Sequence, residues 1–137
     1  MMRVLLTGLL LSASLMLTGC ASVTGVSEGF DKSVNAYNRL LRWHEIDSAG
    51  TTYMAADQQE SFLRQADLLR KRGLSITDYR ILSSRCLPEA RTGEAGTEFD
   101  YYILPSNRIK TISYRQEWVY LEEGKGWKLK SGLPLFE

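Results

Sequence analysis

Gly73 divides the sequence into two parts with different hydrophobic periods. Before it, apolar residues recur every three or four positions, as they do on one face of a helix. After it, apolar and polar residues alternate over several stretches, as they do along a strand with one buried face. Helices that come first and strands that follow predict an α+β domain, and we see no internal repeat or second domain.

The first helical pattern covers residues 28–48. Leu40 and Trp43 widen its apolar stripe, whose main members are Phe30, Val34, Tyr37 and Leu41. We expect Gly50 and the two threonines that follow it to break the helix.

A second helical pattern, in one or two pieces, begins at Tyr53 and Met54. Its stripe consists of Phe62, Ala66 and Leu69. Gly73 fits a C-terminal cap, and the three basic residues before it suit the negative end of the helix dipole.

Four strand-like segments complete the chain: residues 74–84, 97–105, 109–123 and 127–136. Most are joined by short turns, whereas 88–96 is predicted to be a loop. Short connections favour antiparallel neighbours, with one apolar aromatic face and one solvated face. We therefore expect N-terminal helices packed on an antiparallel sheet of about four strands.

The first nineteen residues have the composition of an export signal. Met1, Met2 and Arg3 make a short positive start, Val4 to Met16 carries no charge, and small residues precede Cys20. A membrane-spanning helix needs about 20 apolar residues, so this run is too short to be one. We expect residues 1–19 to be a signal peptide and residues 28–137 to form one domain.

Leu17-Thr18-Gly19-Cys20 resembles the lipobox of bacterial lipoproteins. This resemblance implies that Cys20 receives a lipid, that cleavage occurs before it, and that residues 20–27 form a lipidated tether. Ala21-Ser22 follows the cysteine, which is similar to the outer-membrane default of Gram-negative lipoproteins. An ordinary secretory signal with an incidental cysteine and an inner-membrane location are the alternatives.

Removal of Arg3 with the signal leaves equal numbers of basic and acidic residues, because the full sequence has 17 and 16. Without a basic run, nucleic acid is not expected as a partner. One histidine and one remaining cysteine do not make a structural zinc site, and we expect no metal or cofactor. We interpret Cys86 as a buried free thiol; an intermolecular disulfide is the alternative.

The element order, and the aromatic stretch over residues 114–136, resemble the nuclear transport factor 2-like superfamily, which includes ketosteroid isomerase-like enzymes. The resemblance covers residues 28–136. It implies a sheet curved into a cone whose mouth can hold an apolar ligand, and it assigns no activity.

One set of residues suggests proton transfer. Tyr37, His44 and Asp47 are spaced to share one side of a continuous helix, and such groups serve isomerases and dehydratases. The structural alternative is that Tyr37 packs in the core, His44 hydrogen-bonds at its edge and Asp47 pairs with a neighbour. We expect these structural roles, so no catalytic residue is assigned.

A second set suggests a pocket. Gln116 interrupts an apolar face, where it would orient a ligand or, as we expect, brace a helix residue. The aromatic residues around it would line a pocket or fill the core, and we expect them to fill the core. The candidates are Tyr101, Tyr114, Gln116, Trp118 and Trp127.

These observations predict a lipid-anchored, periplasm-facing envelope protein that binds an envelope protein or a small apolar ligand. The alternative is an isomerase- or dehydratase-like enzyme that acts on a small apolar substrate in the cone. A third possibility is a subunit of an envelope complex that pairs through its open sheet face.

Overall fold

The structure, a computed structural model, describes the backbone of residues 19–124 and 126–137 and the side chains within 25–124 and 126–137. The expected signal segment therefore lies outside the described residues except for Gly19. The Cys20 backbone is described, and its side chain is not.

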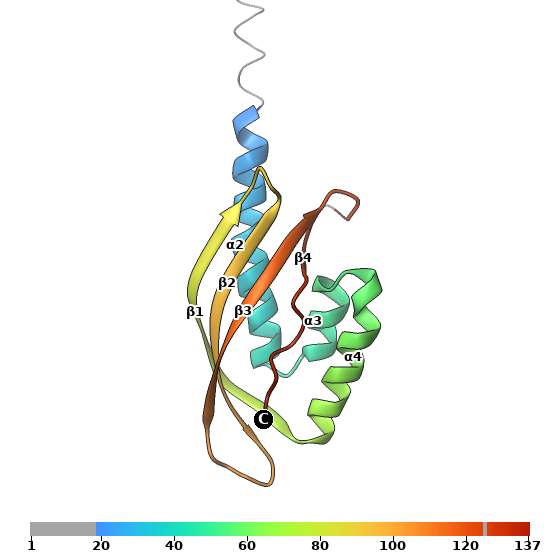
Figure 1. Cartoon of the computed structure of the whole chain (residues 1–137), viewed down its shortest axis with the longest axis vertical. Helices are drawn as coiled ribbons and strands as arrows, with labels where there is room; N and C mark the ends of the chain where they lie inside the picture. Colours follow the sequence, from blue (N-terminus) through green and yellow to red (C-terminus); the bar gives the residue numbers. More distant parts are fainter. Residues whose placement is uncertain (1–18, 125) are drawn as a thin grey trace, which may run out of the picture.

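Three helices come before four strands in the described part of the chain (Figure 1). The helices are α2 (Gly19–Arg42), α3 (Ile46–Tyr53) and α4 (Ala56–Lys71). The strands are β1 (Leu74–Leu87), β2 (Thr92–Ile103), β3 (Lys110–Leu121) and β4 (Gly126–Leu129). This arrangement confirms the predicted α+β fold with N-terminal helices and a four-stranded sheet.

The sheet is an antiparallel meander in the order β1-β2-β3-β4. It curves around the helices, which lie on one of its faces (Figure 1). Apolar side chains of the inner face are buried against those helices, among them Ile76, Phe99, Trp118 and Leu129. Both predicted helical stripes are buried in the same core: Phe30, Val34, Tyr37, Leu41, Phe62, Ala66 and Leu69.

The first helix has different ends from those predicted. Its described part runs from Gly19, so residues 20–27, expected as a tether, are helical. Val26 packs against the core, and its carbonyl oxygen accepts a hydrogen bond from Trp127 Nε1 at 2.9 Å. Contacts with the sheet therefore hold this turn, although its small residues have weak helix propensity.

The break between the first two helices is at residues 43–45, not at Gly50. Gly50 lies inside α3, and a Cβ atom there would be 2.5 Å from the Phe62 ring of α4. The glycine is therefore explained by close packing between α3 and α4, which the sequence pattern does not reveal.

Two strand boundaries also differ from the prediction. β2 begins at Thr92, so much of the segment expected to be a loop is paired with β1, with Gly93 opposite Cys86. β4 ends at Leu129, and residues 130–137 form a tail that runs between the sheet and α4 (Figure 1). Phe136 of the tail packs edge-on against Tyr101, with ring centroids 4.8 Å apart.

Gly93 gives a test of the helix–sheet contact. A Cβ atom at this position would be 2.4 Å from the buried Phe30 ring. Alanine generally favours a strand over glycine by roughly 0.5–1 kcal/mol, but overpacking costs about 1–3 kcal/mol. We expect Gly93→Ala to lower the free energy of unfolding, measured by urea denaturation.

Gly124→Ala is the matched control, because nothing lies within 4 Å of a Cβ atom there. Its stability should change by less than about 0.5 kcal/mol. A Gly93→Ala variant as stable as the wild type would mean that Phe30 moves aside at no cost.

Candidate functional site

The proton-transfer candidates begin with Tyr37, which is completely buried. Its ring packs edge-on against Trp118 of β3 and Tyr53 of α3, with centroid separations of 5.5 and 6.0 Å. Burial, and secondarily the nearby Tyr114, raise the pKa of the Tyr37 phenol well above its ordinary value. Tyr37 is therefore a core side chain that holds its proton.

His44 is exposed and terminates α2. Its φ of 64° lies in the left-handed region, which only glycine adopts without strain. The His44 N–H donates to Leu41 O at 3.2 Å and the Glu45 N–H donates to Leu40 O at 2.9 Å. This pair of hydrogen bonds is a Schellman motif, in which His44 takes the position usually held by glycine.

Asp47 follows that turn and belongs to a different helix. It lies in the first turn of α3, where the helix dipole favours a negative charge, and its side chain is 59% exposed. Arg70 of α4 donates to its Oδ2 atom at 2.7 Å. The structure thus buries Tyr37 in the core, leaves His44 exposed and pairs Asp47 with Arg70, and no hydrogen bond joins any two of these three described residues.

Replacement of His44 tests whether the residue serves only to end the helix. We expect His44→Gly to raise the free energy of unfolding, measured by urea denaturation, by about 0.5–1 kcal/mol. Relief of left-handed strain contributes about 1–2 kcal/mol, and the greater freedom of glycine in the unfolded chain offsets about 0.4–1 kcal/mol.

His44→Ala keeps the Cβ atom and is the control for loss of the imidazole alone. If both variants are less stable than the wild type, the imidazole makes a stabilising contact and the strain argument is wrong.

Gln116 braces the helix, as predicted. It is completely buried, and its amide exchanges two hydrogen bonds with Asn38 of α2, at 2.8 and 3.2 Å. The Asn38 amide also donates to Val34 O at 2.8 Å. Because the two amides hydrogen-bond to each other, Gln116 joins β3 to α2.

The aromatic pocket candidates are largely core residues. Tyr101, Trp118 and Trp127 are each less than 5% exposed. The Tyr101 hydroxyl donates to the Glu137 main-chain oxygen at 3.1 Å. The half-buried Tyr114 donates from its hydroxyl to Ser131 O and, at 3.0 Å, to Gly132 O. The C-terminal tail thus occupies the space inside the curved sheet where the resemblance implied a ligand cavity.

Cys86 is half-buried and faces α2. The Ser27 hydroxyl donates to its Sγ atom at 3.9 Å, and burial raises the pKa of the thiol. This environment agrees with an unreactive thiol.

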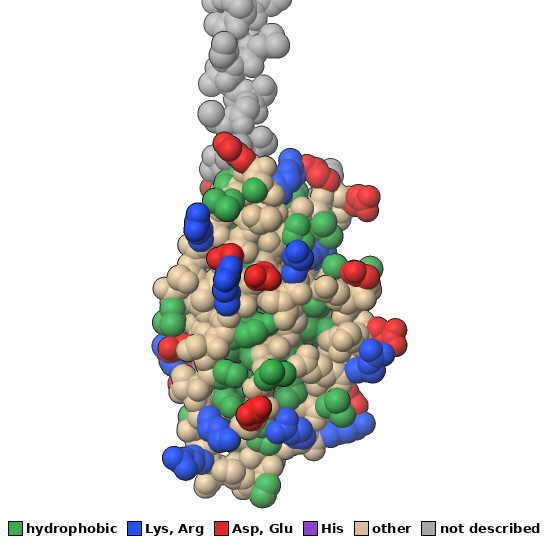
Figure 2. Space-filling view, in the orientation of Figure 1, with side chains coloured by type: hydrophobic (Ala, Val, Ile, Leu, Met, Phe, Trp, Pro, Cys, Tyr) green, Lys and Arg blue, Asp and Glu red, His purple; other side chains and the backbone are tan. Residues whose placement is uncertain are grey.

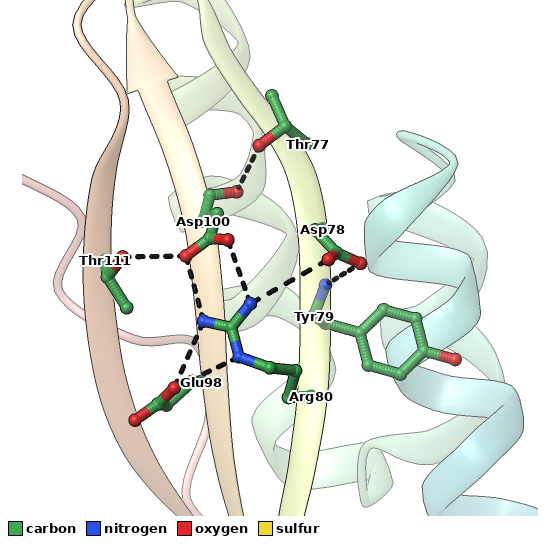
Figure 3. A network of polar contacts seen from close by, with 7 residues as sticks. All are labelled: Thr77, Asp78, Tyr79, Arg80, Glu98, Asp100 and Thr111. Atoms are coloured by element: carbon green, nitrogen blue, oxygen red, sulfur yellow. Dashed lines mark hydrogen bonds and ion pairs between the residues drawn. The ribbon is translucent and has the colours of Figure 1, made fainter.

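The outer face of the sheet carries a charged network that the sequence pattern did not suggest (Figure 3). Arg80 of β1 binds both carboxylate oxygens of Asp100 on β2, at 2.9 and 3.0 Å, and also binds Glu98. Further charged pairs, including Arg115 with Glu94, continue along this face. Such a surface does not favour the apolar pairing of open sheet faces that the third possibility requires.

Asp100 shows the effect of this network. Hydrogen bonds from Arg80 and Thr111 lower the pKa of its carboxyl from 3.8 to about 2. The Thr111 hydroxyl is 2.7 Å from its Oδ1 atom. A lowered pKa means that the folded state favours the ionised carboxylate more than the unfolded state does.

A pH series tests this network. The contribution of Asp100 to stability is present above pH 3.8 and is lost as the pH falls towards about 2. Asp100→Asn should therefore be less stable than the wild type at pH 7, and the difference should narrow as the pH is lowered below 4. Urea denaturation at each pH measures this difference in the free energy of unfolding.

Glu123→Gln, in the exposed turn between β3 and β4, controls for the loss of one negative charge. If the Asp100→Asn difference stays constant from pH 7 to pH 3, the ion pair does not contribute as described.

A groove lies at the end of the domain farthest from the start of α2. The C-terminal half of α4 forms one wall and the tail forms the other, and the enclosed volume is about 470 Å³. Leu68, Leu69, Pro134, Leu135 and Phe136 give it an apolar lining, and Arg72 stands at its edge. The alternating pattern predicted a strand over residues 127–136, where the tail lies, and so did not indicate this groove.

Within 19–124 and 126–137, no helix has the length and hydropathy that crossing a membrane requires. No group of three or more potential metal-binding side chains is found in the same part of the chain.

No protein-family model matches the chain, and no curated protein matches it in sequence. Among solved structures, the crystal structure of the intermembrane-space region of the chloroplast protein ARC6 aligns with it at a TM-score of 0.48 and 13% sequence identity. The alignment covers 72% of this chain and 92% of that chain. At this level of similarity nothing about activity or partners transfers to this chain.

Proposed function

We propose that the chain is a bacterial lipoprotein whose domain is held at the periplasmic face of the outer membrane by lipid on Cys20. The observation that carries this proposal is the sequence Leu17-Thr18-Gly19-Cys20, placed directly after a positive start and an uncharged apolar run. Two or more acyl chains on one residue give stable membrane attachment, whereas one gives only reversible binding.

The position of α2 supports this role. The described part of the helix runs from Gly19 and emerges from one end of the domain (Figure 1). A Cβ atom at Gly25 would have nothing within 4 Å, so this side of the helix faces away from the sheet. An anchor at Cys20 would leave the rest of the domain surface accessible from the aqueous side.

We propose further that the domain binds a partner and does not catalyse a reaction. The isomerase- or dehydratase-like alternative needs Tyr37, His44 and Asp47 at one place, and these side chains lie apart. The helices-then-meander order agrees with the resemblance to the nuclear transport factor 2-like superfamily, and membership of it is part of the proposal. The filled interior favours a binding site on the surface.

Metabolic labelling with a fatty acid tests the anchor. We expect the wild-type chain to incorporate the label and to sediment with the outer membrane, and Cys20→Ala to do neither, because the thiol is the acceptor. Cys86→Ala is the matched control and should be labelled like the wild type. Incorporation by Cys20→Ala would refute the proposal, and an unlabelled wild-type chain would indicate an ordinary secretory signal.

A further inference from the structure

The groove between α4 and the tail has an apolar interior and exposed apolar edges. Leu69 and Phe136 are 5% and 2% exposed and form part of its lining. Leu68 and Leu135, on opposite walls, are 61% and 75% exposed. These leucines are exposed to water on both sides of a concave surface. Covering them with another apolar surface lowers the free energy of the system.

A third exposed leucine extends this surface past the end of α4. Leu104 is 59% exposed, and its N–H donates to Gly73 O at 3.3 Å, which places it beside the residue that follows Arg72. Isolated exposed leucines need no explanation, but Leu68 and Leu135 on the two walls of one groove form a patch.

The groove is lined by two cations, Lys71 and Arg72, and one acidic residue, Glu137, and a third cation, Lys110, lies beside Glu137. Arg72 Nη1 donates to Phe136 O at 3.1 Å, and Lys110 Nζ donates to the Glu137 main-chain oxygen at 2.7 Å. Among the described residues, neither cation forms an ion pair with a carboxylate side chain, whereas Lys71 is paired with Asp67 at 2.7 Å. Figure 2 shows blue side chains on both sides of this end of the molecule, around one acidic group.

We propose that this groove binds an acidic amphipathic segment of a partner protein. Its apolar side chains would cover Leu68 and Leu135, and its carboxylates would face Arg72 and Lys110. The inference rests on the proposal that the domain is a binding module.

An anionic membrane is the other surface that combines negative charge with apolar groups. Two observations favour a protein segment. The site is concave, so it fits a narrow ligand better than a flat surface. It also lies at the opposite end of the domain from the start of α2, and so faces away from the membrane that an anchor at Cys20 would use (Figure 1).

The test uses the full chain in phosphatidylcholine nanodiscs and a fluorescein-labelled helical peptide with leucines on one face and glutamates on the other. Fluorescence anisotropy measures binding. We expect saturable binding that weakens at high salt. A peptide of the same composition in scrambled order, and one with lysine in place of glutamate, should bind at least about tenfold more weakly.

Matched variants locate the binding site. Leu68→Ser should weaken binding about tenfold, while Leu82→Ser, at a leucine 60% exposed on β1, should not. Arg72→Gln should also weaken binding, while Arg64→Gln, on α4 and paired with Glu60, should not. Because Arg72 also contacts the tail, the exposed Leu68 provides the variant that leaves the fold intact.

Reversal of charge completes the design. The chain with Arg72→Glu and Lys110→Glu should reject the glutamate peptide and bind the lysine peptide. Absence of binding by the wild type, or binding that is indifferent to Leu68→Ser, overturns the proposal. Capture of phosphatidylglycerol vesicles through Leu68 and Arg72, without peptide binding, would instead assign the groove to a membrane. None of these results affects fatty-acid labelling, so the two proposals fail separately.

Discussion

Trp118 is the side chain on which the arrangement of helices and sheet depends. It projects from the C-terminal half of β3 and is 1% exposed. Its ring makes edge-on contacts with Phe30 and Tyr37 of α2 and with Tyr53 of α3. Edge-to-face aromatic pairs contribute roughly 0.5–1.5 kcal/mol each beyond their buried area. Gln116, two residues before Trp118, adds the buried hydrogen bonds to Asn38. These bonds fix where α2 lies along β3. Nonpolar packing thus supplies the attraction, and the amide pair supplies the alignment.

The sequence predicted those features that depend on periodicity. Burial of Phe30, Val34 and Leu41 follows from a repeat within one helix. The antiparallel meander follows from the alternating pattern of each strand and the short connections between strands. It did not predict features that depend on contacts between elements. Gly50 resembles a helix breaker, yet it lies inside α3 because the Phe62 ring occupies the space a side chain would need.

The proton-transfer candidates show the same dependence on contacts and turns outside the periodic pattern. The spacing of Tyr37, His44 and Asp47 places them together only if one helix continues through all three, and a left-handed residue at 44 ends that helix. The Arg80–Asp100 pair was not predictable because cross-strand neighbours depend on register, and β1 has irregularities between Ile76 and Asp78 and between Ile81 and Ser83. Gln116 was predictable in part, because a buried amide on an apolar face requires a partner, although Asn38 could not be named in advance.

The continuity of α2 has a mechanical consequence. A helix of 24 residues spans about 36 Å, and here it passes without interruption from the residue beside Cys20 into the core. A chain attached through a flexible linker would tumble and offer its surfaces in every direction. If Cys20 carries the proposed lipid, this helix limits how far the domain can move from the membrane surface, so a partner would meet the domain within a thin layer parallel to that surface.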